Sequence, residues 1–123
     1  MSSTYTMIPR PIGLFAGLDM TTRYAFGLIY DRWQCSNRKD NREKFKDSYG
    51  VYCVFSREAM AAEMGVSLPT LRAAVSLLIQ RELVYSRIPA PGSAWRYYIP
   101  DNVRDEIEDP DIAVISSLSP SQT

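Results

Sequence analysis

Arg72 is the side chain in this sequence that is best suited to reading a nucleic-acid base. It is the only cation in the first three turns of a helix predicted over residues 68–81. Its guanidinium group could donate two hydrogen bonds to O6 and N7 of a guanine, a contact that discriminates between bases by roughly 1–3 kcal/mol. Such a contact would give sequence-specific binding of double-stranded DNA. A surface pair between Arg72 and Ser76 or an acidic neighbour is the alternative.

The outer side of the same predicted helix carries small and polar side chains. Thr70 and Ser76 can donate to a phosphate or a base, and Ala73 could touch a thymine methyl group. The helix start at Ser67 offers free backbone N–H groups and the positive end of the helix dipole to a phosphate. An exposed Leu77 on a helix with so few charges also suits a surface that binds protein instead of DNA.

A second group of candidate DNA contacts surrounds a predicted turn over residues 89–94. Arg87 and Arg96 flank this turn, and arginines in such a hairpin commonly contact phosphates or the minor groove. Arg57, at the start of an earlier predicted helix, is a further candidate for a phosphate contact. The complete set of expected DNA contacts is Arg57, Ser67, Pro69, Thr70, Arg72, Ala73, Ser76, Arg87, Ser93 and Arg96.

Residues 56–81 have the spacing of a helix-turn-helix, which would position the first of these groups. Ala61 falls where two crossing helices come closest, and Gly65 falls where the turn needs a left-handed backbone conformation. Ser56 and Ser67 each precede a helix as N-caps, and Pro69 lies in the first turn of the second helix. Helices are therefore predicted over about 57–64 and 68–81. The inward-facing residues would be Met60, Met64, Val66, Leu71 and Ala74.

Two short strands after these helices predict a wing. Residues 83–88 and 95–99 are rich in β-branched and aromatic side chains, and PAPGSA between them reverses the chain. Residues 51–55 (VYCVF) supply a third strand. The predicted fold is therefore α+β, a winged helix-turn-helix with a small three-stranded antiparallel sheet. Trp95 either belongs to the core or stacks on bases, and the core is favoured.

A helix predicted over residues 21–35 carries apolar side chains on two sides. One side has Tyr24 and Leu28, while Phe26, Tyr30 and Trp33 line another. This pattern is typical of a central helix in a small domain. Alternatively, the second side packs on a sister subunit, and we expect a homodimer in which these three aromatic residues contribute to the contact.

Charge divides the chain into two parts. Residues 1–100 hold 13 basic and 8 acidic side chains, whereas residues 101–123 hold one arginine and six acids. We expect a winged-helix DNA-binding domain over 1–100 and an acidic, partly disordered tail over 101–123, in which residues 102–108 could form a short helix. Deleting residues 104–123 should leave thermal stability nearly unchanged and tighten DNA binding at low salt. The polar stretch 36–49 has a net charge of +2 and is expected to be a solvated loop, with phosphate contacts as the alternative.

An enzyme is not expected. The sequence has no histidine, no glycine-rich phosphate loop and no nucleophile beside a base. Cys35 and Cys53 lack metal-ligand spacing, so we expect two reduced thiols, with Cys53 buried in a strand, and no metal, cofactor or small-molecule substrate. Apolar runs are short and the N-terminus lacks a signal-peptide core, so a cytoplasmic protein without membrane contact is expected.

The order of these segments resembles the N-terminal domain of the plasmid replication initiator A family of Gram-positive bacteria. The resemblance covers residues 5–100 and is carried by YTMIPRPIGLF, LDMTTRYAFGLIYDRW, YGVYCVFS, EAMAAEMGVSLPTLRAAVSLLIQRELV and WRYYI. It implies a winged-helix domain that binds repeated sites at a plasmid origin and dimerises. A transcription regulator built on the same domain, or a winged-helix protein-interaction module without DNA function, are the alternatives.

Overall fold

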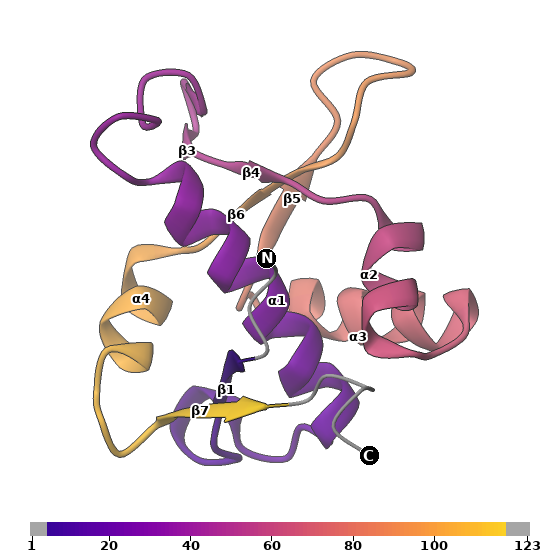
Figure 1. Cartoon of the computed structure of the whole chain (residues 1–123), viewed down its shortest axis with the longest axis vertical. Coiled ribbons are helices and arrows are strands. Elements are labelled where there is room, and N and C mark those ends of the chain that lie inside the picture. Colours follow the sequence, from indigo (N-terminus) through magenta and orange to yellow (C-terminus); the bar gives the residue numbers. More distant parts are fainter. Residues whose placement is uncertain (1–4, 118–123) are drawn as a thin grey trace.

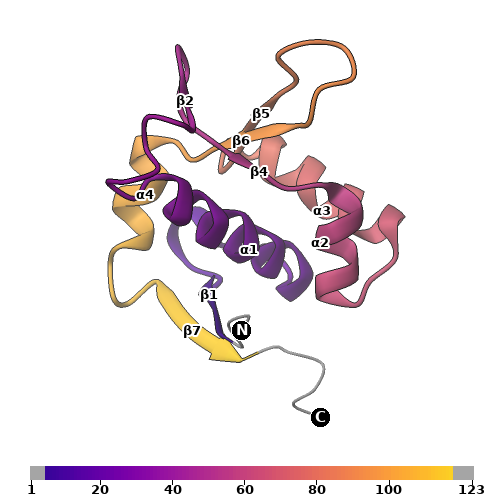
Figure 2. The same cartoon turned by 45° about the horizontal axis from the view of Figure 1, so that its top comes forward.

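The computed structural model describes residues 5–117, which form a central helix surrounded by shorter elements (Figure 1). In chain order, the elements are β1 (Tyr5–Pro9), the 3-10 helix η1 (Gly13–Phe15), α1 (Met20–Ser36), β2 (Lys46–Asp47), β3 (Gly50–Val51), β4 (Cys53–Val54), α2 (Arg57–Met64), α3 (Leu68–Gln80), β5 (Tyr85–Arg87), β6 (Arg96–Tyr98), α4 (Asp101–Ile107) and β7 (Ala113–Ser117). In both cartoons α4 lies on one side of α1, and α2 and α3 lie on the other (Figures 1 and 2).

The predicted helix-turn-helix is confirmed, with its caps. Ser56 Oγ accepts a hydrogen bond from the Ala59 N–H at 3.0 Å, and Ser67 Oγ accepts one from the Thr70 N–H at 3.3 Å. Gly65 ends α2 with φ +71°, the left-handed conformation that glycine adopts at little cost. The two helices meet at a bend of 109°, within the range of this motif.

The three-stranded antiparallel sheet of the wing is also confirmed, in the order β4-β6-β5. Tyr97 of β6 pairs with Cys53 of β4 on one side and with Ser86 of β5 on the other. Tyr97 and Cys53 are fully buried, so this face of the sheet belongs to the core. Burial of Cys53 in a strand was predicted, and desolvation raises the pKa of its thiol to about 12.

The expected detachable tail is wrong for residues 101–117. Val103, Ile107 and Ile112 are buried in the main core, and β7 pairs with β1 over five residues in antiparallel register. The acidic side chains of residues 101–111 are largely exposed, while Val103 and Ile107, four residues apart in α4, face inward. Overall charge concealed this amphipathic pattern. Residues 118–123, also assigned to the tail, lie outside the described residues.

The expected dimer contact through α1 is wrong as well. Phe26, Tyr30 and Trp33 are 0–5% exposed and pack inside one chain. Phe26 lies edge-on to Phe15 of η1 at a ring distance of 4.9 Å, and the Trp33 indole N–H donates to Val51 O at 2.9 Å. The second apolar side of α1 is therefore covered by η1, α4 and the strands, as in a central helix. No single helix within residues 5–117 is long and apolar enough to cross a membrane, although α2 and α3 pass that test together as a bent pair.

Asp31 of α1 predicts an unusual dependence of stability on pH. Desolvation raises the pKa of its carboxyl group to about 6, with a smaller contribution from the charge of Glu63, although the Met7 N–H bonds to it. The folded state therefore prefers the protonated acid. This stabilisation is complete below the unfolded value of 3.8 and is lost as the pH rises through about 6. Asp31 keeps part of its surface in solvent, and screening reduces the effect of this shift. Asp31→Asn should therefore raise the unfolding free energy at pH 7 by on the order of 2 kcal/mol and remove this dependence.

Urea denaturation at several pH values from acid to neutral would measure the effect. Asp40→Asn is the matched control because Asp40 is exposed in the loop after α1. The prediction would be contradicted if the stability difference between Asp31→Asn and the wild type were no larger at pH 7 than at pH 5.

Candidate nucleic-acid interface

The outer face of α3 presents the residues that the sequence predicted for base reading. Arg72, Ala73 and Ser76 are exposed, while Leu71, Ala74, Val75 and Leu78 on the opposite side are buried. The periodicity of α3 dictates this division, because buried residues recur every three or four positions. Leu77 is only partly exposed and packs against the core. The face is therefore less apolar than the sequence indicated.

The start of α3 is fixed by Ser67 and Thr70. Besides capping the helix, the Ser67 hydroxyl donates to Thr70 Oγ1 at 2.9 Å. The hydroxyl proton of Thr70 is then free to be donated outward to an acceptor. Pro69 between them is exposed and lies in the first turn of α3. Backbone N–H groups in a first turn have no acceptor within the helix, so the N–H that proline lacks costs no hydrogen bond there.

A hollow of about 240 Å³ opens between α2, α3 and the wing. Arg72 of α3 lines it together with Arg57 at the start of α2 and Trp95 at the base of the wing. The remaining lining residues are Val54, Ser56, Glu58 and Ala94. The structure thus brings Arg57 and Arg72, two predicted contacts from different helices, to the same depression on the surface.

Arg57 is held in place by two aromatic side chains. Its guanidinium carbon lies 4.7 Å from the Trp95 ring centre, and its Nε–H donates to the Tyr97 hydroxyl at 3.4 Å. Part of the Trp95 side chain packs against the core, and the face of its ring contacts the Arg57 guanidinium group. The cation–π contact leaves the other guanidinium N–H groups available to an anion in the hollow.

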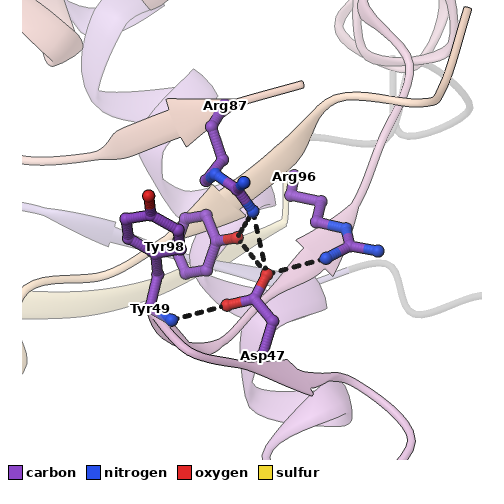
Figure 3. Close-up of polar contacts among 5 residues, drawn as sticks. All are labelled: Asp47, Tyr49, Arg87, Arg96 and Tyr98. Atoms are coloured by element: carbon purple, nitrogen blue, oxygen red, sulfur yellow. Dashed lines mark hydrogen bonds and ion pairs between the residues drawn. The ribbon is translucent and has the colours of Figure 1, made fainter. Parts of the chain in front are cut away.

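Arg87 and Arg96, the two predicted wing contacts, face an acidic residue of the same chain. Their Nη1 atoms lie 3.2 Å and 2.7 Å from Asp47 Oδ2, and Tyr98 donates its hydroxyl to the same oxygen at 2.6 Å (Figure 3). The Tyr49 N–H donates to Asp47 Oδ1 at 2.8 Å. Desolvation raises the pKa of Asp47, but hydrogen bonds from Tyr98, Tyr49 and Arg96 outweigh it and lower the pKa overall.

Sequence reasoning missed Asp47 entirely. It assigned residues 36–49 to a solvated loop, whereas Lys46–Asp47 pairs with Gly50–Val51 in a hairpin that covers the outer side of the wing sheet. Asp47 lies 40 residues from Arg87 along the chain and 49 from Arg96. No local pattern links residues so far apart. Ser93, the last predicted contact, is exposed in the wing turn beside Gly92, whose φ is +83°.

No family model and no curated protein sequence matches this chain. Chains of solved structures, in contrast, are similar to it in fold. One, described as "N-Terminal domain of DNA binding protein", superposes with a TM-score of 0.57 at 18% identity and covers 81% of this chain and 79% of that one. Another, described as "Structure of Rep-DNA complex", has a TM-score of 0.56 at 18% identity over 80% and 78% of the two chains. At this identity, the likeness establishes a shared fold.

Proposed function

We propose that this chain binds double-stranded DNA, with the outer face of α3 in the major groove and the wing on the backbone. One observation carries the proposal: Arg57, Arg72 and the base of the wing, from three separate elements, line one hollow beside the exposed face of α3. A recognition helix needs this combination of a base-reading side chain and neighbouring groups that hold phosphates. The fold shared with a protein solved as a Rep–DNA complex supports the proposal.

In finer detail, we propose that the DNA sites are origin repeats read during plasmid replication initiation, without catalysis by this chain. The family resemblance of residues 5–100 suggests this role, and paired sites would suit a homodimer. Since Phe26, Tyr30 and Trp33 are buried within one chain, a dimer would need a different surface.

Arg72→Ala should separate base reading from phosphate binding. Because Arg72 is exposed on the outer face of α3, its loss should weaken binding to the specific site by roughly 1–3 kcal/mol and relax preference at one base pair. Binding selection from a random library would find the site, and competition titrations with single-base variants would measure the preference.

Arg10→Ala is a suitable control because it removes the same charge from an exposed position just after β1, away from the hollow. It should leave base preference unchanged. If Arg72→Ala weakened all sequences equally, Arg72 would contact only phosphates. If the wild-type chain bound no duplex at low salt, the DNA function would be excluded, and a protein-interaction role would become the better explanation.

A further inference from the structure

Asp47 Oδ2 accepts hydrogen bonds from three side chains of the wing sheet. Arg96 Nη1 is 2.7 Å away, Arg87 Nη1 is 3.2 Å away and the Tyr98 hydroxyl is 2.6 Å away. The two arginines are direct partners in the β5–β6 register, so their side chains leave the same face of the sheet. Asp47 reaches them from the β2–β3 hairpin, a separate part of the chain (Figure 3).

Aromatic rings hold both guanidinium groups in this arrangement. The Arg87 guanidinium lies 4.1 Å from the centre of the Tyr49 ring, and that of Arg96 lies 4.2 Å from the Tyr52 ring. Yet neither arginine is sealed from solvent, because each side chain is 26% exposed. The wing loop and the β2–β3 hairpin project from the same side of the molecule (Figure 2). Both arginines are therefore near the region where the wing would meet a DNA backbone.

Asp47 Oδ2 lies where a phosphate oxygen could accept the same hydrogen bonds from Arg87 and Arg96. Guanidinium groups bind carboxylates and phosphates with the same N–H donors, and a phosphate offers more acceptor oxygens and more charge. One carboxylate between two guanidinium groups leaves a single net positive charge and takes one donor from each arginine. A phosphate that bound these two arginines in the same way would have to displace Asp47.

We propose that Asp47 is a specificity-determining residue that withholds Arg87 and Arg96 from DNA phosphates. Phosphate contacts raise the affinity for every sequence alike, so two arginines released to the backbone would strengthen random binding most. With both arginines engaged by Asp47, discrimination between sites depends on the outer face of α3. The inference rests on the proposed DNA binding and adds to it a residue that limits binding to unrelated sequences.

Asp47→Asn in the full chain tests the proposal, because it removes the charge and keeps the shape of the side chain. Asp40→Asn is the matched control, since it makes the same change in net charge at an exposed position of the same loop region. Affinity for a mixed-sequence duplex is measured over a series of salt concentrations. The slope of log K against log salt should steepen by about 0.9 for each arginine that gains a phosphate, and Asp40→Asn should steepen it less.

Removing the arginines then shows whether they cause the effect. Asp47→Asn combined with Arg87→Gln and Arg96→Gln should return the slope and the random-duplex affinity to the wild-type level or slightly below it, because this triple variant has one positive charge fewer than the wild type. Equal slopes for Asp47→Asn and Asp40→Asn would overturn the proposal. So would weaker random binding by Asp47→Asn, which would make Asp47 a positioning residue for the wing, or a steep slope that survives loss of both arginines.

A measurement without DNA keeps the proposal separate from the proposed function. The NMR signals of the Arg87 and Arg96 side-chain Nε–H groups should shift with added inorganic phosphate in Asp47→Asn and stay in place in the wild-type chain. Shifts of equal size in both proteins would show that Asp47 does not keep phosphate from these arginines and would overturn the proposal. If phosphate shifted the signals only in Asp47→Asn, the pairing of Asp47 with the two arginines would be supported. If neither protein then bound duplex DNA, the proposed DNA function would be excluded while that pairing still held.

Wild-type protein provides a check that does not depend on the stability of the variant. When random duplex is added, backbone amides of α3 should shift while the Arg87 and Arg96 side-chain signals stay in place. Movement of those two signals at low salt would show that DNA already displaces Asp47, contrary to the proposal.

Discussion

A chain ending at Pro100 should fail to fold, although the segment removed holds six acids and only one arginine. Val103, Ile107 and Ile112 are 0–6% exposed and belong to the same core as α1. Burying three aliphatic side chains contributes about 5–9 kcal/mol in total, whereas an entire domain is stable by only about 5–15 kcal/mol. The truncation also leaves β1 without its partner β7. Circular dichroism should show no cooperative thermal transition.

Single substitutions in α4 test the same point without removing the chain. Ile107→Ala should cost about 2–5 kcal/mol because it opens a cavity beside α1. Asp105→Ala, on the exposed side of the same helix, should stay within about 0.5 kcal/mol of the wild type. Urea unfolding would give both values. A truncated chain that unfolds cooperatively near the wild-type midpoint would restore the view of this segment as a dispensable tail.

Gly27→Ala should destabilise the protein by about 3 kcal/mol, at the upper end for overpacked sites. A Cβ atom at Gly27 would lie 2.4 Å from the Met7 carbonyl oxygen and 2.9 Å from Thr6 Cγ2. The first of these is a backbone atom of β1, so no side-chain rotation can relieve the clash. Strand β1 would have to move away from α1, and β7 is paired with it.

The sign of this effect is what makes it informative. In an open helix, glycine to alanine stabilises by up to about 1 kcal/mol. Gln34→Ala, at an exposed position of α1, provides a control for helix propensity and should be nearly neutral. Thermal unfolding followed by circular dichroism would compare the two variants. A stabilised Gly27→Ala protein would mean that β1 does not lie against α1 as closely as described.

Local rules predicted the part of the fold that would meet DNA. Ser56, Gly65 and Ser67 act on neighbours within a few residues, so their positions could be read from spacing alone. The wing turn and the two strands beside it are local in the same sense. These elements appear where the sequence placed them, and the exposed face of α3 follows from helical periodicity.

Long-range pairings could not be predicted, and they account for the errors. Strands β1 and β7 are each short, and neither sequence predicts that its partner strand lies at the other end of the chain. Likewise, Asp47 looked like one of several charges in a polar run, because its partners are separated from it by the whole helix-turn-helix. The short helix expected over 102–108 is present as α4, but no local pattern showed that α4 and η1 would pack against the core that the aromatic side of α1 enters, so that side suggested a second subunit.

The pairing of β1 with β7 also sets an order of events during synthesis. Pro9 meets Ala113, so closing this contact joins positions about 100 residues apart and carries a large loop-closure cost. During synthesis, β1 and α1 emerge well before β7, so β1 waits for its partner until the last of residues 101–117 has been made. A nascent chain in this interval would still lack Val103, Ile107 and Ile112 and would expose the part of the core that they complete. Stable folding of the part of the chain that the structure describes would thus wait for β7, its C-terminal strand.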